Sequence, residues 1–299
     1  MDRSRVVGRS ISLSMIAFLL IGALLSADGN VRAVGVEGDG QAAGLEPRRR
    51  VYAPYFSGEI EWAEAGLFWF GRVDPPEDHS GQNYVDVRVA YTAEELVLRI
   101  AVEDYYLWYD PDATSTSDLT QYDGVAVYLD TAHDGAGAPQ PDDYSFLSAL
   151  YVWWEDGSAY SREARGTGAG WDTGWEGNWT AGDTRAQWFV DPGYNDDQWD
   201  YGWWTHVHVP WSTLGLSGPP SEGTIWGLGV QLYDRDAASS SGIVPPEYWP
   251  ETFGESNPST WGELAFGLAT YTPEPAMAQR ATVIRRGLAG TVEDAYVGG

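Results

Sequence analysis

The chain has 299 residues and a formal net charge of −27 at pH 7, with 44 acidic residues against 17 basic ones, every one of them arginine. A surface this acidic repels nucleic acids and anionic membranes, so we expect neither as a partner. There is no cysteine, which excludes disulfide bonds, thiolate metal sites and lipid attachment at cysteine.

The N-terminus has the composition of a secretory signal peptide. Three arginines precede the uncharged stretch Ser10–Ala27, and small residues follow it. This stretch is shorter than the roughly 20 apolar residues of a spanning helix, although a retained anchor is the alternative. We predict a signal peptide over residues 1–33, cleaved after Ala33 or alternatively after Ala27. The mature protein is then secreted or held at the cell surface, without stable membrane insertion.

Residues 34–50 are rich in Gly and Arg and are predicted to form a linker. Alternation of apolar and polar residues, with a period of two, starts after them. Asp86–Tyr91 and Leu96–Val102 alternate on either side of a turn at Thr92–Glu95, which predicts a β-hairpin. Leu96, Leu98, Ile100 and Val102 share one face of the second strand. This face is the first part of the predicted core.

Further strands are predicted at Val125–Leu129, Ser145–Trp154, His206–Val209 and Ile225–Tyr233. The segments between them, such as Asp110–Asp118, Asp130–Asp143 and Asp191–Asp200, are loops rich in Asp, Gly and Pro. Helical periodicity of useful length is absent after the signal peptide. We therefore predict an all-β protein whose single main domain, residues 51–268, is an antiparallel, jelly-roll-like β-sandwich.

The C-terminal stretch changes in character. Residues 269–280 form a linker that contains proline, and residues 281–299 resume a strand-like pattern that is too short to bury a core alone. This last segment is interpreted as the start of a further β-module or as a strand docked on the main domain.

Tryptophan is unusually abundant, with 16 residues in the chain. Flat aromatic rings stack on the C–H faces of sugar rings, but they also fill β-sandwich cores. Any single tryptophan is more readily explained as a core residue. As a group, the tryptophans in polar, Gly-rich segments favour a binding surface.

Five blocks resemble, in their order, the family 9 carbohydrate-binding modules and the related DOMON domains. They are Ala93–Asp104 (AEELVLRIAVED), Tyr122–Asp130 (YDGVAVYLD), Val207–Leu214 (VHVPWSTL), Trp226–Asp236 (WGLGVQLYDRD) and Trp261–Phe266 (WGELAF). The resemblance implies an antiparallel sandwich that often accompanies glycoside hydrolases in secreted proteins.

The same resemblance implies where a sugar is held. Two tryptophans clamp a terminal sugar in well-known members, and the matching positions here are Thr120 and Glu255. Tyr122 is the aromatic residue nearest the first position, and Trp249 and Phe253 lie near the second. An acidic and an arginine position of the family fall at Ala126 and Leu147, whereas Gln231 matches a family glutamine. These residues and Trp153 are the predicted carbohydrate-binding residues: Tyr122, Trp153, Gln231, Trp249 and Phe253.

Aspartates at strand ends are candidate ligands for a structural calcium ion, because Ca²⁺ prefers hard oxygen ligands. Asp104, Asp130 and Asp234 each end a predicted strand and are expected to converge at the rim of the sandwich. The alternative is that these side chains cap turns. No catalytic cofactor is expected.

Catalysis is not predicted. A glycosidase needs two placed carboxylates, but an acidic chain offers such pairs everywhere, and no G-x-S-x-G nucleophile motif occurs. His206 and His208 share a strand face and could hold a metal or haem edge, yet two exposed strand histidines explain them as well.

The sequence thus predicts an exported, non-catalytic module that binds a neutral polysaccharide, or its chain end, by aromatic stacking, within a larger glycan-degrading or surface protein. One alternative is a structural or adhesive sandwich that has lost its glycan site. A second is an accessory module of a glycoside hydrolase whose catalytic domain is not in this chain.

Overall fold

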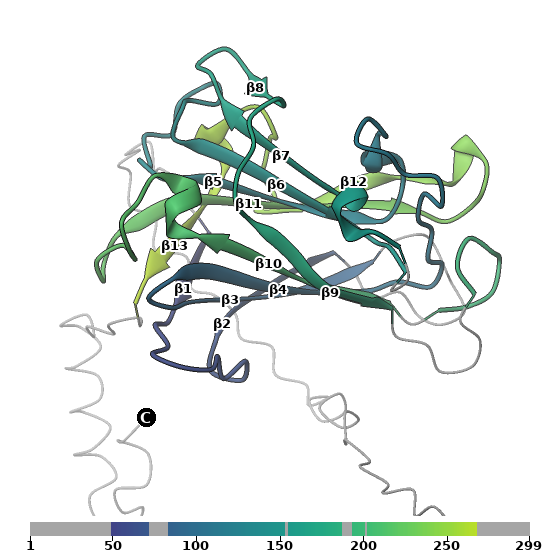
Figure 1. The fold of residues 1–299 in the computed structure, drawn as a ribbon, viewed down its shortest axis with the longest axis horizontal. Helices are drawn as coiled ribbons and strands as arrows, with labels where there is room; N and C mark the ends of the chain where they lie inside the picture. Colours follow the sequence, from purple (N-terminus) through teal and green to yellow (C-terminus); the bar gives the residue numbers. More distant parts are fainter. Residues whose placement is uncertain (1–48, 72–82, 153–154, 187–192, 201, 268–299) are drawn as a thin grey trace, which may run out of the picture. The chain divides into compact units, whose positions relative to one another are not determined.

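The computed structural model describes residues 49–71, 83–152, 155–186, 193–200 and 202–267. The predicted signal peptide, nearly all of the first linker, the second linker and the C-terminal segment lie outside these residues. Within the described residues the chain forms two β-sheets packed face to face, joined by loops and short 3₁₀ helices (Figure 1). The predicted all-β sandwich is confirmed.

The larger sheet has eight strands, in the order β1-β13-β11-β5-β6-β7-β8, with β12 also paired to β11. Their bounds are β1 Arg50–Ala53, β5 Gly124–Asp130, β6 Asp143–Ala149, β7 Ser161–Gly166, β8 Trp171–Asp172, β11 Ile225–Arg235, β12 Ile243–Trp249 and β13 Gly262–Phe266. The β1–β13 pair is parallel, and the other ladders of this sheet are antiparallel.

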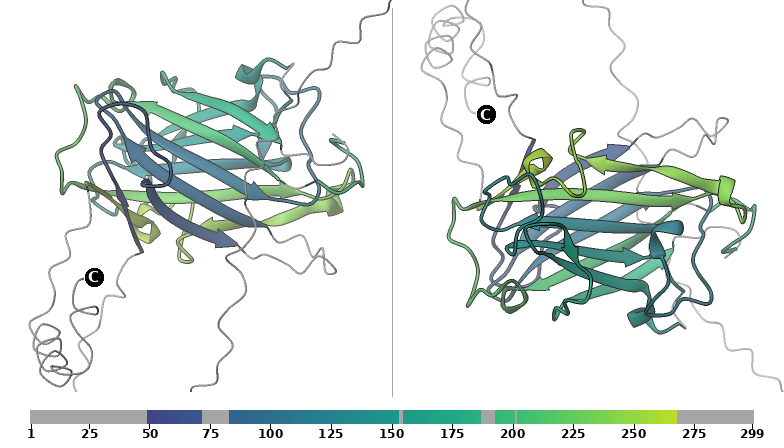
Figure 2. Two further views of the ribbon diagram at one scale, coloured as in Figure 1. Left: turned by 90° about the horizontal axis from the view of Figure 1, so that it is seen from below. Right: turned by 90° about the horizontal axis from the view of Figure 1, so that it is seen from above.

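The smaller sheet has five strands, in the order β2-β3-β4-β10-β9, all antiparallel. Their bounds are β2 Gly66–Gly71, β3 Tyr84–Tyr91, β4 Glu95–Glu103, β9 Thr180–Ala186 and β10 Trp203–Pro210. The views in Figure 2 look onto the two outer faces, with the smaller sheet nearer on the left and the larger nearer on the right.

The predicted hairpin is β3–β4, with Tyr91 opposite Leu96. Its apolar face is buried as expected, because Leu96, Leu98 and Ile100 have no exposed surface and Val102 has 3%. The strand predicted at Ser145–Trp154 is too long. It ends at Ala149, where the Leu150 N–H leaves the ladder and donates to the Asp123 carbonyl at 2.7 Å.

The core lies between the sheets and takes alternate side chains from each. On β10, Val207 and Val209 point inward while His206 and His208 stay partly exposed, as predicted. One polar pair also lies in the core: the Ser148 and Thr205 hydroxyls are 3.1 Å apart and satisfy each other. None of the helices in the described ranges is long and apolar enough to cross a membrane.

Candidate functional site

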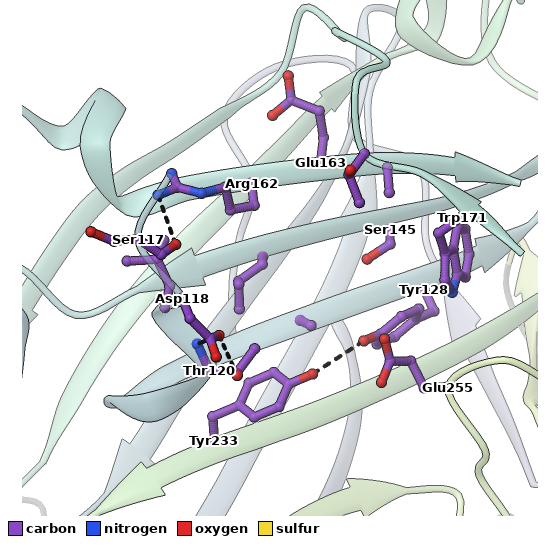
Figure 3. A pocket seen from close by; sticks show the side chains of 15 residues that line it. Ser117, Asp118, Thr120, Tyr128, Ser145, Arg162, Glu163, Trp171, Tyr233 and Glu255 are labelled. Carbon is purple, nitrogen blue, oxygen red and sulfur yellow. Dashed lines mark hydrogen bonds between the residues drawn. The ribbon is translucent and has the colours of Figure 1, made fainter. Parts of the chain in front are cut away.

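A groove of about 240 Å³ lies on the outer side of the larger sheet, over β11, β5, β6 and β7 (Figure 3). Strand alternation explains how it forms. On β5, Val125, Val127 and Leu129 point into the core, so Ala126 and Tyr128 point outward into the groove. Ala126 is the small residue at the centre of the floor, and its register partners are Leu147 on β6 and Gln231 on β11.

One wall of the groove is the 3₁₀ helix η1 (Leu119–Gln121) with the residues before it. Asp118 caps this helix: its Oδ1 accepts from the Thr120 backbone N–H at 3.1 Å and from the Thr120 hydroxyl at 2.6 Å. Arg162 on β7 donates to the Ser117 carbonyl at 3.2 Å and to the Ala159 carbonyl at 3.0 Å. These bonds attach the wall to β7, so the rim is held rather than loose.

Aromatic rings close the other end of the groove. Trp171 of β8 is half-buried, its ring centroid 5.9 Å from that of Tyr128 and 6.4 Å from that of Trp261. The Tyr128 and Tyr233 hydroxyls meet at 3.5 Å on the floor. Burial raises the pKa of Tyr128, and it raises the pKa of Tyr233 to about 12, so both are neutral hydroxyls at physiological pH. A flat indole next to neutral hydroxyls is a surface that suits a sugar ring.

Three carboxylates surround this surface. The Glu163 carboxylate already accepts from the Trp179 indole N–H at 2.9 Å, whereas Glu255 stands at the rim with an exposed side chain. Partial desolvation by its neighbours raises the pKa of the Glu255 carboxyl. Carboxylates are strong hydrogen-bond acceptors for hydroxyl groups, so the groove offers acceptors around an aromatic platform.

The positions at which the family resemblance predicted sugar contacts do come together. Thr120, Ala126, Leu147 and Glu255 all line this groove. Ala126 stands where the family has an acidic residue and Leu147 where it has an arginine. Acidic and basic side chains reach the groove from other positions instead, among them Asp118 and Arg162.

Four of the five predicted binding residues lie elsewhere. Trp249 is 6% exposed and packs in the core, its ring centroid 4.2 Å from that of Phe68. Phe253 is 8% exposed, and its ring covers Gly229. A Cβ added at Gly229 would come within 2.3 Å of this ring. Gln231 is buried between its register partners Ala126 and Tyr248.

Tyr122 lies behind the wall of the groove, where its ring faces the Arg235 guanidinium at 4.9 Å. Trp153 lies outside the described residues. Trp249, Phe253, Gln231 and Tyr122 therefore do not line the groove.

The three aspartates predicted as calcium ligands separate into two groups. Asp104 and Asp234 come together with Asp123, with one carboxylate oxygen of each within 4.8 Å of the others. All three are buried, and burial, joined by repulsion from neighbouring carboxylates, raises the pKa of each well above its ordinary value. Asp104 Oδ2 has no hydrogen-bond partner within the described chain.

Asp130 belongs to the second group, with Asp142 and Asp143. The Asp130 carboxylate accepts backbone N–H groups of His133 and Gly135, as the turn-capping alternative predicted. Burial raises the pKa of Asp143 to about 7, and its Oδ1 has no partner among the described residues. Asp104, Asp130 and Asp234 thus do not form one site, because Asp130 lies at the opposite end of the β5–β11 ladder from Asp234.

Sequence analysis missed most of the groove. Trp171 and Thr173 lie in the segment Thr167–Asn178 (TGAGWDTGWEGN), whose tryptophans in Gly-rich surroundings were the available signal. Arg162 carried no local signal, because it acts through bonds to Thr114 and Ser117, which are far from it in the chain. Asp123 was missed because it lies just before a strand instead of at the end of one.

Comparison with protein-family models and with curated proteins finds no match to this sequence. Among solved structures, the chain is similar to a protein of Bacteroides uniformis ATCC 8492 that is provisionally assigned to carbohydrate binding. The TM-score is 0.51 at 11% identity, covering 73% of this chain and 99% of that one.

It is also similar to a family 9 carbohydrate-binding module of Caldicellulosiruptor kristjanssonii. The complex of that module with cellotriose gives a TM-score of 0.47 at 19% identity, covering 75% of this chain and 100% of that one. Its complex with glucose gives 0.46 at 19%, covering 76% and 100%. The likeness to the Bacteroides uniformis protein is one of fold, and it agrees with the predicted all-β sandwich.

Proposed function

We propose that the chain is a carbohydrate-binding module and that the groove over β5, β6, β7 and β11 holds a neutral sugar. The observation that carries the proposal is the juxtaposition of Trp171 with the neutral hydroxyls of Tyr128 and Tyr233 and the acceptors Asp118 and Glu255. An indole covers the apolar face of a sugar ring, and the polar groups bind its edge hydroxyls.

The size of the groove limits what it binds. A volume of about 240 Å³ holds one or two sugar rings, so recognition of a chain end or a short stretch is favoured over a long chain. A small open site of this kind supplies about 4–8 kcal/mol of binding free energy, which corresponds to millimolar to micromolar affinity. Because the ligand is uncharged, salt is expected to change this affinity little.

The test is a binding screen against soluble oligosaccharides of cellulose, xylan and chitin, with a charged oligosaccharide as the control. The proposal expects at least one neutral oligosaccharide to bind and the acidic one to be rejected by the carboxylates of the groove. Absence of binding to every glycan would favour the structural or adhesive alternative, in which the fold is kept and the sugar site is lost.

We further propose that Asp104, Asp123 and Asp234 hold a structural Ca²⁺. Three buried carboxylates within reach of one another are costly unless a cation compensates them, and carboxylate oxygens are the ligands that Ca²⁺ prefers. The guanidinium of the neighbouring Arg235 donates to the backbone carbonyls of Gln121 and Ala237. These hydrogen bonds are not made to the three aspartates. Asp123→Asn is expected to weaken calcium binding measured by calorimetry on metal-stripped protein, whereas Asp172→Asn, at the exposed end of β8, is not.

Export remains part of the proposal, with mature protein that starts near Val34 and acts outside the cell as a non-catalytic module. Support comes from the basic, then apolar, N-terminus together with a fold that is similar to carbohydrate-binding proteins. N-terminal sequencing of the protein secreted by its host tests this. Intact Met1 on protein retained inside the cell would contradict it.

A further inference from the structure

The outer face of the smaller sheet carries aromatic side chains that the groove does not use. Trp69 on β2 is 61% exposed and Leu67 is 49% exposed, although both belong to a regular strand. The Tyr84 ring of β3 lies beside Trp69, with centroids 6.1 Å apart. Large exposed apolar side chains that cluster on one face indicate a contact surface, whereas isolated ones do not.

Strand register places a second tryptophan in line with the first. Trp69 pairs with Asp86, Asp86 with Ala101, and Ala101 with Trp204, which crosses β2, β3, β4 and β10 in one row. Strands lie about 4.8 Å apart, so the two tryptophans stand about 14 Å apart on the same face. Ala101 is the small residue between them, and it leaves the middle of the row low.

The neighbouring row is covered by the chain itself. The loop before β2 brings Trp62 over it: the Trp62 ring stacks on His206 at 5.4 Å, and its carbonyl accepts from Arg88 at 2.7 Å. Arg99 also lies near the Trp62 ring, at 5.9 Å. The row from Trp69 to Trp204 is the part of the sheet that this loop contact does not reach.

We propose that this row, with Tyr84 beside it, is a second carbohydrate-binding surface that holds an extended neutral polysaccharide lying flat across the strands. This proposal rests on the proposed function of the groove in one respect, namely that the ligand is a carbohydrate. Strands about 4.8 Å apart place the two indoles about 14 Å apart, which matches a ligand several sugar rings long. The groove, in contrast, holds one or two sugar rings. Asp86 and Glu103 supply acceptors for hydroxyls along the same face.

Charge selects this occupant over the others. The chain carries a formal net charge of −27, so a second copy and a nucleic acid are both repelled, while a neutral polysaccharide is not. Near the row itself the charges compensate each other, because Arg88 and Asp86 form an ion pair at 3.2 Å. The row of Trp69, Asp86, Ala101 and Trp204 thus carries no uncompensated charge, and Glu103 lies beside it, opposite Tyr84.

The experiment compares adsorption to solids with binding of soluble sugars. The double variant Trp69→Ala/Trp204→Ala is assayed for adsorption to microcrystalline cellulose, insoluble xylan and chitin, and for calorimetric binding of the soluble oligosaccharides. Ala101→Arg is a second variant, which keeps both indoles and places a long charged side chain between them. Trp199→Ala is the matched control, because Trp199 is 54% exposed but lies outside the two sheets.

We expect the double variant and Ala101→Arg each to lower adsorption to the bound solid at least tenfold while soluble binding stays within twofold of the parent. Trp199→Ala is expected to leave both unchanged. The inference is overturned if both face variants adsorb like the control, if the parent adsorbs to no solid, or if sedimentation shows that the row mediates self-association. Adsorption without any soluble binding would instead contradict the groove and leave this face standing.

Discussion

Phe253 and Gly229 show how one residue shapes the edge of the groove. The Phe253 ring lies over the β11 backbone at Gly229 and contacts Tyr128, with ring centroids 5.1 Å apart. No side chain fits beneath the ring, since an added Cβ at Gly229 would come within 2.3 Å of Phe253 Cε2. The glycine therefore permits the packing that holds Tyr128 on the groove floor.

Gly229→Ala is expected to lower the free energy of unfolding by roughly 1–3 kcal/mol, because the overpacked ring must move. Chemical denaturation measures this change. Gly137→Ala is the matched control, since a Cβ at Gly137 meets nothing within 4 Å. Equal stability of the two variants would contradict the packing described for Phe253.

At the scale of the elements, alternation of apolar residues predicted six strands of the sandwich and the hairpin β3–β4. It did not predict β12, because Pro245 and Pro246 fall inside it and proline rarely occurs in a paired strand. Strand β12 pairs with β11 alone, so one of its sides is unpaired, and proline is tolerated in such a strand. Strands β7 and β9 were missed because their polar, Gly-containing sequences carry little alternation.

The same limit applies to the site. The family resemblance located the groove through Thr120, Ala126, Leu147 and Glu255, since a conserved fold preserves the place of each position. It did not indicate the other side chains that line the groove. Trp171 enters from β8, outside the matched blocks. Whether an aromatic ring is buried, as for Trp249, depends on packing between distant strands.

At the scale of the whole molecule, buried aspartates couple stability to pH. Asp143 has its pKa raised to about 7 and Asp236 to about 6 by burial, against an ordinary value of 3.8. A carboxyl whose pKa is higher in the folded state binds its proton more tightly there. Its stabilising contribution is therefore complete below about pH 4 and is lost as the pH rises towards 7.

The melting temperature of metal-stripped protein in chelator is thus expected to fall between pH 4 and pH 7. Saturating Ca²⁺ should reverse the fall near pH 7, because a ligand that binds only the folded state at 100 times its Kd adds about 2.7 kcal/mol. High salt, which screens surface charge, is the control for general repulsion. A melting temperature that is equal with calcium and with chelator at pH 7 would contradict the calcium proposal.

The central claim is that the groove over β5, β6, β7 and β11 binds a neutral sugar through Trp171. The most direct measurement is calorimetric titration of the parent, Trp171→Ala and the control Trp199→Ala with the soluble oligosaccharide that binds the parent. Loss of the stacking indole is expected to weaken binding at least tenfold, about 1.4 kcal/mol, while the control binds like the parent. Full affinity in Trp171→Ala, with the parent fold retained, would contradict the claim.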